Sequence, residues 1–430
     1  MDRPDRSAPP AGRRDDTGGG ISRRALLAGA ALGGVGLFLA ACGSTTTPPP
    51  PASLAGGPSA SPPASPPGPP SVAPTPSTPP SASLPPPVSL RHRIAGLMVV
   101  GFRGSELADA AWVRNALADS GLGGVILFDR DQLTGGSRNV LSPAQVKRLT
   151  ADLRAAAGDR GMIVSVDQEG GIVTRLGPSH GFPAVASEAT IGAGSTSAAR
   201  TWAKLIATTL AGNGFNLNFA PVVDLDANPD SPAIGGLDRS FSADPDVVVA
   251  RATIEIDAHR AAGVRTTLKH FPGIGSSTTN TDFGVADVTK TWTARELEPF
   301  AQLIAAEHAD LVMAGHVVNG QFDPSHPASL SPTIVTHLLR GQLGWDGVVV
   351  TDDLQAAAIT KAFGRDEAVL LALEAGNDLL LFANQQVYDP KLVTRVVDLV
   401  GAAVASGRIP EARIDEAYAR VQALFRTAAS

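Results

Sequence analysis

The most constraining feature of the sequence is an alternation of short β-branched apolar runs with longer Ala- and Leu-rich stretches, which extends over residues 88–430. Such alternation is typical of βα units around a parallel sheet. The runs expected to form strands are Met98–Phe102, Gly124–Phe128, Met162–Asp167, Asn216–Asp224, Val264–His270, Leu311–His316, Val348–Asp353 and Leu379–Ala383. They match the strand number of a TIM barrel, so the sequence predicts an α/β fold with a single (β/α)8 TIM-barrel domain. A doubly wound open sheet is the second choice, disfavoured because no strand precedes a Gly-x-Gly-x-x-Gly turn.

Residues 1–42 have the features of an export signal. The pair Arg23-Arg24, typical of twin-arginine export, precedes a Gly- and Ala-rich apolar run that ends in Leu39-Ala40-Ala41-Cys42. This ending resembles a lipobox, where bacterial lipoproteins are lipidated on the cysteine. We therefore expect a lipoprotein signal peptide, lipidation of Cys42, and an exported protein anchored to the outer face of the cytoplasmic membrane. General secretion stays open as a route, and a transmembrane anchor is the alternative, although Ala25–Ala41 is shorter than the ~20 apolar residues of a spanning helix.

Residues 43–87 consist mainly of Pro, Ser, Thr and Ala, without charges. This composition cannot form a core and predicts a disordered, Pro-rich tether. The net charge is −6 and the domain has no Lys/Arg-rich block, which argues against nucleic acid and favours a sugar or another neutral ligand. Cys42 is the only cysteine, which excludes an intrachain disulfide and a cysteine metal site. No metal or organic cofactor is implied, and we expect a monomer.

Polar and charged residues gather where the expected strands end. These residues are Asp129, Arg130, Asp167–Glu169, Asp224, Lys269, His270, His316, Asp352 and Asp353. In a TIM barrel this edge holds the catalytic residues, and in an open sheet the same edge forms the ligand crevice. The predicted location of the site therefore does not depend on the choice of architecture.

Four motifs at these strand ends occur in a specific order. They are Gly123–Phe128, Ser165–Arg175 (SVDQEGGIVTR), Lys269–Gly273 (KHFPG) and Val350–Leu354 (VTDDL). Together they resemble family-3 glycoside hydrolases of the β-N-acetylglucosaminidase branch, over a region from about Leu90 to about Leu424. The resemblance implies a TIM-barrel enzyme that cleaves β-linked amino sugars.

Asp352 follows a β-branched run, so we expect it at a rigid strand end, where an ionised carboxylate can attack or stabilise an oxocarbenium-like carbon. The resemblance implies that Asp352 is the nucleophile. Asp353 should point to the opposite side, because side chains alternate along a strand, and should cap the next helix or hydrogen-bond within the loop. Two solvated loop acids are the alternative.

Asp167 and Glu169 follow an apolar strand and precede Gly170-Gly171, which lets backbone approach a ligand. An acid there can accept hydrogen bonds from sugar hydroxyls, and Arg175 can donate others. The resemblance implies this substrate-binding role for Asp167 and Arg175 and leaves Glu169 as a supporting group. The alternative is that Asp167 and Arg175 simply pair with each other.

Lys269 and His270 close the fifth expected strand and match the substrate-binding pair of the family, while Arg239 matches a further sugar contact. Arg239 could instead pair with Asp238 or another nearby acid. His316 also ends a strand, where it either binds substrate or is a packed, hydrogen-bonded histidine.

The loop after Gly273 departs from the family pattern. The amino-sugar branch usually carries Asp-x-His there, with the His as general acid/base and the Asp as its partner. Asp282 aligns with that Asp, and Gly284 stands where the His should be. A positioned proton donor typically contributes roughly 10²–10⁴-fold in rate, so another group must supply the proton. Asp282 is the candidate acid/base, or the partner of one, if bound substrate raises its pKa.

The sequence therefore favours a retaining, exo-acting β-N-acetylglucosaminidase that hydrolyses terminal β-linked N-acetylhexosamine from cell-wall (peptidoglycan) or chitin-type fragments. A β-glucosidase or a phosphorylase on the same fold is the alternative enzyme. A catalytically weak carbohydrate-binding lipoprotein is the alternative from another class, because the usual acid/base histidine is absent.

Overall fold

The computed structural model describes residues 88–280 and 284–426. The Arg23-Arg24 pair, Cys42, the tether of residues 43–87 and the candidate acid/base Asp282 lie outside the described residues. Among the described helices, none combines the length and the apolar character that a membrane span requires.

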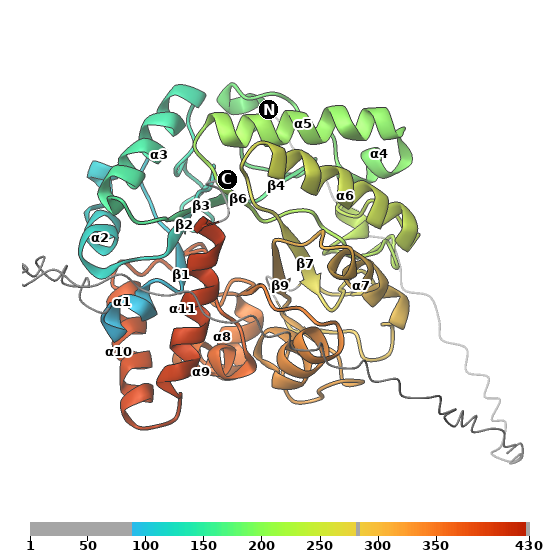
Figure 1. Ribbon diagram of the computed structural model, residues 1–430. Helices are drawn as coiled ribbons and strands as arrows, with labels where there is room; N and C mark the ends of the chain where they lie inside the picture. Colours follow the sequence, from blue (N-terminus) through green and yellow to red (C-terminus); the bar gives the residue numbers. More distant parts are fainter. Residues whose placement is uncertain (1–87, 281–283, 427–430) are drawn as a thin grey trace, which may run out of the picture. The chain divides into compact units, whose positions relative to one another are not determined.

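Parallel strands form the centre of the domain (Figure 1). Their bounds are β1 (Met98–Gly101), β2 (Gly124–Ile126), β3 (Ile163–Val166), β6 (Leu217–Asn218), β7 (Thr267–Phe271), β9 (Leu311–Ala314), β11 (Val348–Thr351) and β12 (Leu380–Phe382). One sheet has the order β12-β1-β2-β3-β6, and a second has the order β11-β9-β7. Every run expected to be a strand overlaps one of these strands, although β7 extends one residue beyond the expected run, to Phe271. The prediction of a parallel α/β domain is therefore confirmed.

Isolated parallel bridges link the two sheets. Leu217 pairs with Arg265 and Val222 with Lys269 on one side, and Val350 pairs with Leu379 on the other. The expected strand Asn216–Asp224 is largely irregular, because Pro221 has no amide hydrogen for a ladder. The carbonyl of Pro221 nevertheless accepts a hydrogen bond from the Lys269 amide at 3.3 Å, so this segment still runs beside β7.

Two short strand pairs lie outside the two main sheets. β4 (Gln168–Gly170) pairs with β5 (Val173–Thr174) in antiparallel fashion, and β8 (Ala286–Asp287) pairs with β10 (Val317–Val318) in parallel fashion.

Helices fill the connections between the parallel strands. The α-helices are α1 (Leu90–Ala95), α2 (Ala111–Asn115), α3 (Pro143–Ala157), α4 (Glu188–Ala193), α5 (Thr196–Gly212), α6 (Pro245–Ala261), α7 (Glu298–Ala305), α8 (Ala357–Phe363), α9 (Arg365–Ala375), α10 (Leu392–Ala405) and α11 (Glu411–Arg426). Shorter helical turns are η1 (Leu107–Asp109), η2 (Ala116–Ser120), η3 (Pro178–His180), η4 (Gly235–Leu237), η5 (Ala294–Leu297) and η6 (Ala328–Leu330), and the longer segment η7 (Thr333–Gln342) connects β9 to β11.

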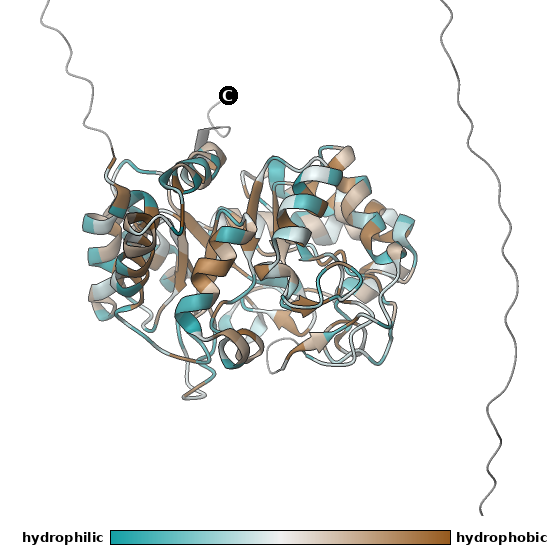
Figure 2. Ribbon diagram, turned by 90° about the horizontal axis from the view of Figure 1, so that it is seen from below, coloured by the Kyte–Doolittle hydropathy of each residue, from teal (hydrophilic) through white to brown (hydrophobic). Residues whose placement is uncertain are grey.

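Helix α3 illustrates how local sequence sets these elements. The Ser142 hydroxyl caps the helix by accepting a hydrogen bond from the Gln145 amide, and Pro143 occupies the first position, where no amide donor is needed. The helix stops at Gly158, whose φ of +67° favours glycine. Helices of the domain carry hydrophilic and hydrophobic residues side by side, whereas the strands are mainly hydrophobic (Figure 2), as expected for helices packed on one face.

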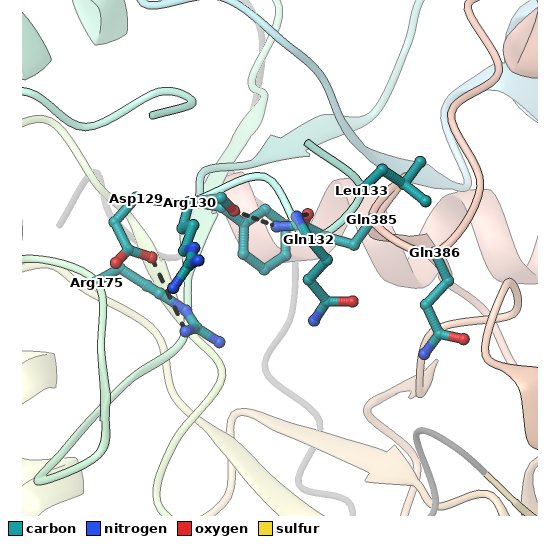
Figure 3. A pocket seen from close by; sticks show the side chains of 8 residues that line it. Asp129, Arg130, Gln132, Leu133, Arg175, Gln385 and Gln386 are labelled. Atoms are coloured by element: carbon teal, nitrogen blue, oxygen red, sulfur yellow. Dashed lines mark hydrogen bonds and ion pairs between the residues drawn. The ribbon is translucent and has the colours of Figure 1, made fainter. Parts of the chain in front are cut away.

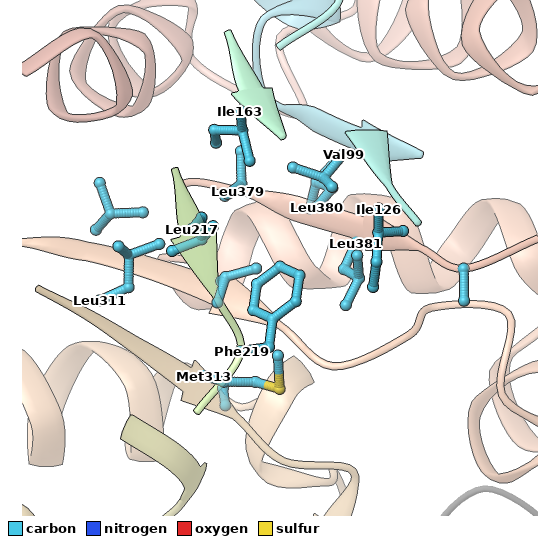
Figure 4. Packing of buried hydrophobic residues seen from close by; sticks show 14 of the residues in the cluster. Val99, Ile126, Ile163, Leu217, Phe219, Leu311, Met313, Leu379, Leu380 and Leu381 are labelled. Carbon is cyan, nitrogen blue, oxygen red and sulfur yellow. The ribbon is translucent and has the colours of Figure 1, made fainter. Parts of the chain in front are cut away.

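The core lies between the strands of the two sheets. Figure 4 shows side chains of both sheets that belong to one buried apolar cluster, among them Val99, Ile126, Leu217, Leu311 and Leu380, each at most 2% exposed. The space between the strands is therefore filled with apolar side chains, which fixes the strand ends rigidly.

Candidate active site

A cavity of about 180 Å³ lies at the carboxyl ends of the parallel strands. It is lined by Ile126, Phe128, Gln132, Asp167, Glu169, Val173, Arg175, Leu237, Arg239, Lys269, His270, Asn280, Met313, Asp352, Asp353, Leu381, Ala383, Gln385 and Gln386. The structure thus brings together the predicted residues Asp167, Arg175, Arg239, Lys269, His270 and Asp352, which come from distant parts of the chain.

Asp352 follows β11 directly and is held by backbone on both sides. Its amide donates to the Ala314 carbonyl at 3.1 Å, and its Oδ1 accepts from the Asp353 amide at 2.8 Å. Burial alone would raise the pKa of the Asp352 carboxyl, but the neighbouring His316 and His270 and the Asp353 amide lower it below its ordinary value. Asp352 is therefore an ionised carboxylate at the cavity wall.

Asp353 also borders the cavity, but its carboxylate has different partners. Its Oδ1 accepts hydrogen bonds from the backbone amides of Gln355, at 3.1 Å, and Ala383, at 3.0 Å. The expected hydrogen bonding within the loop is confirmed, and it extends to the end of β12. Through these bonds Asp353 links the loop after β11 to the loop after β12.

His316 is not among the residues that line the cavity. It is buried, with Nδ1 at 2.7 Å from the Ser329 hydroxyl and Nε2 at 2.8 Å from the Asp353 carbonyl oxygen. The structure therefore agrees with the packed, hydrogen-bonded interpretation of His316, which supports the Asp352 loop from behind.

A network of charges forms one wall of the cavity. Lys269 Nζ lies 2.6 Å from Glu169 Oε1 and 3.0 Å from Asp167 Oδ1. The guanidinium of Arg239 binds the same Glu169 in a bidentate manner, at 2.7 Å and 2.8 Å. The alternative pairing of Asp167 with Arg175 is not observed, because Asp167 pairs with Lys269. Arg239 is likewise held by Glu169 rather than by Asp238.

Glu169 is the centre of this network and is almost completely buried. Burial by itself raises the pKa of its carboxyl, but the charges of Arg239 and Lys269 outweigh burial and lower it well below its usual range. For Lys269 the effects have the opposite signs: burial by itself lowers the pKa of its amino group, but the negative charges of Glu169 and Asp167 outweigh burial. The pKa of Lys269 is therefore above its ordinary value. All three groups are therefore charged, and Glu169 orients two cations at the cavity.

Asp224 is a functional residue to which the sequence assigned no role. Its Oδ2 lies 2.7 Å from His270 Nδ1 and accepts a hydrogen bond from the backbone amide of His270 at 3.0 Å. Its Oδ1 accepts a hydrogen bond from the backbone amide of Ile274 at 2.9 Å. Because Nδ1 is engaged with Asp224, Nε2 is the nitrogen of His270 that is left for the cavity. The only sequence signal was the position of Asp224 at a strand end.

A second, wider cavity of about 640 Å³ adjoins the first (Figure 3). It is lined by Phe128, Asp129, Arg130, Gln132, Leu133, Arg175, Gln385 and Gln386, several of which border both cavities. Arg175 stands between the two, 3.9 Å from Asp129 and above the Phe128 ring, with its buried Nε unbonded. The Arg130 side chain has no ion pair with any described residue, so this cavity offers cationic groups to a ligand.

The loop that should carry the acid/base is anchored at its start. In addition to the bond from Ile274 to Asp224, the Ser276 amide donates to Glu296 Oε2 at 3.2 Å. Asn280 lines the inner cavity. Asp282 lies outside the described residues. Within the described ranges, no group of three or more His, Cys, Asp or Glu residues is arranged to hold a metal ion.

A partly buried, ionised carboxylate beside a small cavity with several hydrogen-bonding side chains is compatible with a glycosidase-type site. Residues 89–424 match the glycosyl hydrolase family 3 N terminal domain. The chain therefore belongs to glycoside hydrolase family 3, and it is a glycoside hydrolase.

Individual relatives agree with this family. A beta-hexosaminidase of Xanthomonas euvesicatoria pv. vesicatoria (strain 85-10) is 38% identical over 314 residues, which cover 71% of this chain and 87% of the relative. The fold resembles a family 3 beta-N-acetylglucosaminidase from Paenibacillus sp. str. FPU-7, with a TM-score of 0.72, 36% identity, and coverage of 80% of this chain and 63% of that one. It also resembles a beta-N-acetylhexosaminidase from Beutenbergia cavernae DSM 12333, with a TM-score of 0.68, 36% identity, and coverage of 78% and 98%.

Proposed function

We propose that the protein is a retaining, exo-acting β-N-acetylglucosaminidase that removes terminal β-linked N-acetylhexosamine from peptidoglycan or chitin-type fragments. The observation that carries this proposal is the ionised Asp352 carboxylate beside a small cavity that also exposes Asp167, Lys269 and His270. The names of the related proteins support the amino-sugar specificity.

The proposed reaction is a double displacement. Asp352 attacks the anomeric carbon while the glycosidic C–O bond breaks, and the leaving oxygen takes a proton from a general acid. Water then gives a proton to the same acid/base group and attacks the anomeric carbon, which breaks the bond to Asp352 and releases a β-configured product. Asp167, Arg175, Arg239, Lys269 and His270 bind the sugar in this proposal, directly or by orienting one another, and His316 contributes from behind.

We propose Asp282 as the general acid/base or as its partner. The support is proximity in the sequence, because Asn280 lines the cavity only two positions earlier. The described carboxyls of the cavity are otherwise committed: Asp167 and Glu169 pair with Lys269, and Asp353 accepts backbone amides.

Exo action is supported by the size difference between the cavities. The inner cavity, of about 180 Å³, suits one terminal sugar ring, and the adjoining cavity, of about 640 Å³, suits the rest of the substrate. Muramic acid of peptidoglycan carries a carboxylate that chitin lacks. Arg130 and Arg175 in the outer cavity therefore favour a peptidoglycan fragment.

We also propose that the two parallel sheets close into a (β/α)8 barrel. The parallel bridges between Leu217 and Arg265 and between Val350 and Leu379 support this closure, because they join the edges of the two sheets on both sides.

The activity is tested by comparing para-nitrophenyl β-N-acetylglucosaminide with the β-glucoside, each with and without phosphate. We expect release of nitrophenol only from the amino sugar, at a rate that phosphate does not change. Preference for the glucoside would indicate a β-glucosidase, and a sugar phosphate product would indicate a phosphorylase. Sugar binding without turnover would indicate a binding lipoprotein.

We further propose that the protein is exported, anchored to the outer face of the cytoplasmic membrane by lipid on Cys42, and monomeric, with residues 43–87 as the tether. The C42A protein should move from the membrane fraction to the soluble fraction. Equal partitioning of both proteins would contradict the anchor. Deletion of residues 45–87 should leave hydrolysis of a small soluble substrate unchanged, because no predicted site residue lies there.

A further inference from the structure

Two buried carboxyl groups lie beneath the charge network and have no cation of their own. Glu188 begins α4 and Glu255 belongs to α6, and the two side chains are 1% and 0% exposed. Oε1 of Glu188 accepts a hydrogen bond from the Val222 amide at 3.1 Å. Oε2 of Glu188 and both side-chain oxygens of Glu255 have no hydrogen-bond partner among the described residues.

The ionisable groups around this pair are Glu169 on β4, Lys269 on β7, Arg239, and His259 one turn along α6 from Glu255. Lys269 and Arg239 are already bound by Glu169 and Asp167. Among the described residues, the two cations Lys269 and Arg239 are matched by the two carboxylates Glu169 and Asp167, so these cations supply no positive charge to a second pair of carboxylates.

His259 does not supply that charge either. It is fully buried, and its Nδ1 lies 2.8 Å from the Glu255 carbonyl oxygen while Nε2 lies 3.2 Å from Asn218 Nδ2. Because the side-chain nitrogen Nδ2 of Asn218 can only donate, Nε2 of His259 accepts, and Nδ1 carries the proton of a neutral ring. Burial lowers the pKa of His259 to about 4, which agrees with this assignment.

We propose that Glu188 and Glu255 are positioning residues that each hold a proton and are therefore uncharged, and that they thereby keep Lys269 and Arg239 directed at Glu169, Asp167 and the bound sugar. An unpaired carboxylate in a dry interior is so unfavourable that it takes up a proton. Burial, together with the like charge of the neighbouring acids, raises the pKa of both Glu188 and Glu255 well above the ordinary value.

The position of the pair connects it to sugar binding. Val222, which donates to Glu188, forms a parallel bridge with Lys269, and the Val223 amide donates to the Lys269 carbonyl at 2.9 Å. Helix α4 also supports the segment that carries Arg239, since the Ala189 amide donates to the Asp238 carbonyl at 3.2 Å. If the pair lost its protons, its negative charge would draw Lys269 and Arg239 away from the cavity.

The first test does not depend on the proposed activity. Infrared spectra of the full-length protein at neutral pH should contain the C=O stretch of protonated carboxylic acids, and E188Q and E255Q should each weaken it. The variant E298Q, which changes an exposed glutamate on α7, is the matched control and should leave the band unchanged. Identical spectra for wild type and both buried-site variants would overturn the proposal.

The second test follows stability as pH rises. A carboxyl whose pKa is raised in the folded protein binds its proton more tightly there, so its contribution to stability is lost as pH rises through the raised value. The free energy of unfolding of the wild type should therefore fall toward alkaline pH, and the double variant E188Q/E255Q should fall less steeply. Parallel curves would contradict the proposal that Glu188 and Glu255 are protonated. If the double variant does not fold, E188Q and E255Q are measured singly.

The third test is equilibrium binding of N-acetylglucosamine, which rests on the proposed function but needs no proton transfer. Near neutral pH, E188Q and E255Q should bind within about twofold of wild type, because an amide mimics a neutral acid in shape. In alkaline solution they should bind about tenfold more tightly than wild type. This factor corresponds to roughly the free energy of one charge-assisted hydrogen bond. E188L removes the acceptor for Val222 and should weaken binding at every pH.

A tenfold loss of binding by both glutamine variants at neutral pH would show that the negative charges are needed, and would overturn the proposal. If no protein of the set binds N-acetylglucosamine, the proposed function fails, whereas the infrared and stability results still decide whether the pair is protonated.

Discussion

Buried acids surrounded by cations occur at both ends of the parallel strands: Asp378 at the amino ends and Glu169 at the carboxyl ends. The two acids differ in what their ion pairs hold in place. Asp378 precedes β12 at the amino ends of the strands. Its carboxylate lies 2.6 Å from Arg340, 2.9 Å from Arg413 and 3.4 Å from Arg420, and also accepts the Val349 amide at 3.1 Å. These bonds tie η7 and α11 to β11, so the cluster holds helices against a sheet.

Glu169, at the carboxyl ends, binds Arg239 and Lys269 with similar geometry, but its cluster borders a cavity and continues to the partly exposed Asp167. Across that cavity stands Asp352, which has no ion pair with any lysine or arginine of the described residues. A cavity alone does not distinguish the two ends, because one of about 340 Å³ at the amino ends is lined by arginines and aspartates that pair with one another. The difference is that Asp352 is an ionised acid without a lysine or arginine partner among the described residues, which supports the proposal that it is the nucleophile.

The sharpest test of this comparison is D352N, which keeps the size of the side chain but removes its charge. Turnover should fall by about 10³-fold, as when other groups that stabilise the transition state are removed. The melting temperature should hardly change, because no ion pair is broken. Steady-state kinetics and thermal unfolding measure the two effects. A 2-fluoro or 5-fluoro glycosyl inhibitor should add its mass to the peptide containing Asp352, and a label on Asp353 would move the nucleophile by one residue.

The next largest effect is expected from E169Q, which leaves Lys269 and Arg239 without their shared carboxylate. We expect kcat/KM to fall by about 10²-fold, because the two side chains that we propose to bind the sugar would be misplaced. Stability should also fall. The pKa of Glu169 is lower in the folded protein than in the unfolded chain, where it is about 4.3. The ionised carboxylate therefore stabilises the folded protein above about pH 4.3, and this stabilisation is lost as the pH falls below that value. The stability difference between wild type and E169Q should therefore narrow in acid, and a widening gap would contradict this account.

D378N is the counterpart at the amino ends. Removing one partner of a buried ion cluster typically costs about 3–5 kcal/mol, so the free energy of unfolding should drop by that order. The kcat/KM of the folded variant should stay within about twofold of wild type, because the cluster is remote from the cavity. Denaturant unfolding and kinetics at low temperature check both statements. A large loss of kcat/KM in the folded variant would remove the distinction between the two clusters.

The smallest effect is expected from R130A, which alters only the outer cavity in Figure 3. For a muramic acid-containing disaccharide, KM should rise by about fivefold, which corresponds to roughly the free energy of one exposed ion pair. For the nitrophenyl amino sugar and for chitobiose, KM should be unchanged. An equal effect on all three substrates would argue against recognition of an anionic aglycone.

Much of the fold and the location of the site followed from local patterns. The β-branched runs marked the parallel strands, because burial on both faces selects such residues wherever a strand lies inside. Residues at the ends of these runs, such as Asp352 and Lys269, were predicted to share one edge, and they do border one cavity. The apolar run Asn216–Asp224 predicts a full strand, whereas the structure forms only β6 there, because Pro221 lacks the amide hydrogen that a strand ladder needs.

The choice of partners was decided only by tertiary structure. Arg239 pairs with Glu169, 70 positions away, rather than with its neighbour Asp238, and Asp167 pairs with Lys269, 102 positions away, rather than with Arg175. Local sequence states which charges exist, but the energy of a buried ion pair depends on distance, burial and competing partners, which the tertiary fold sets. The same reason explains why Glu188 and Glu255 look like ordinary helix glutamates in the sequence and become an uncharged-pair candidate only when the fold buries them together.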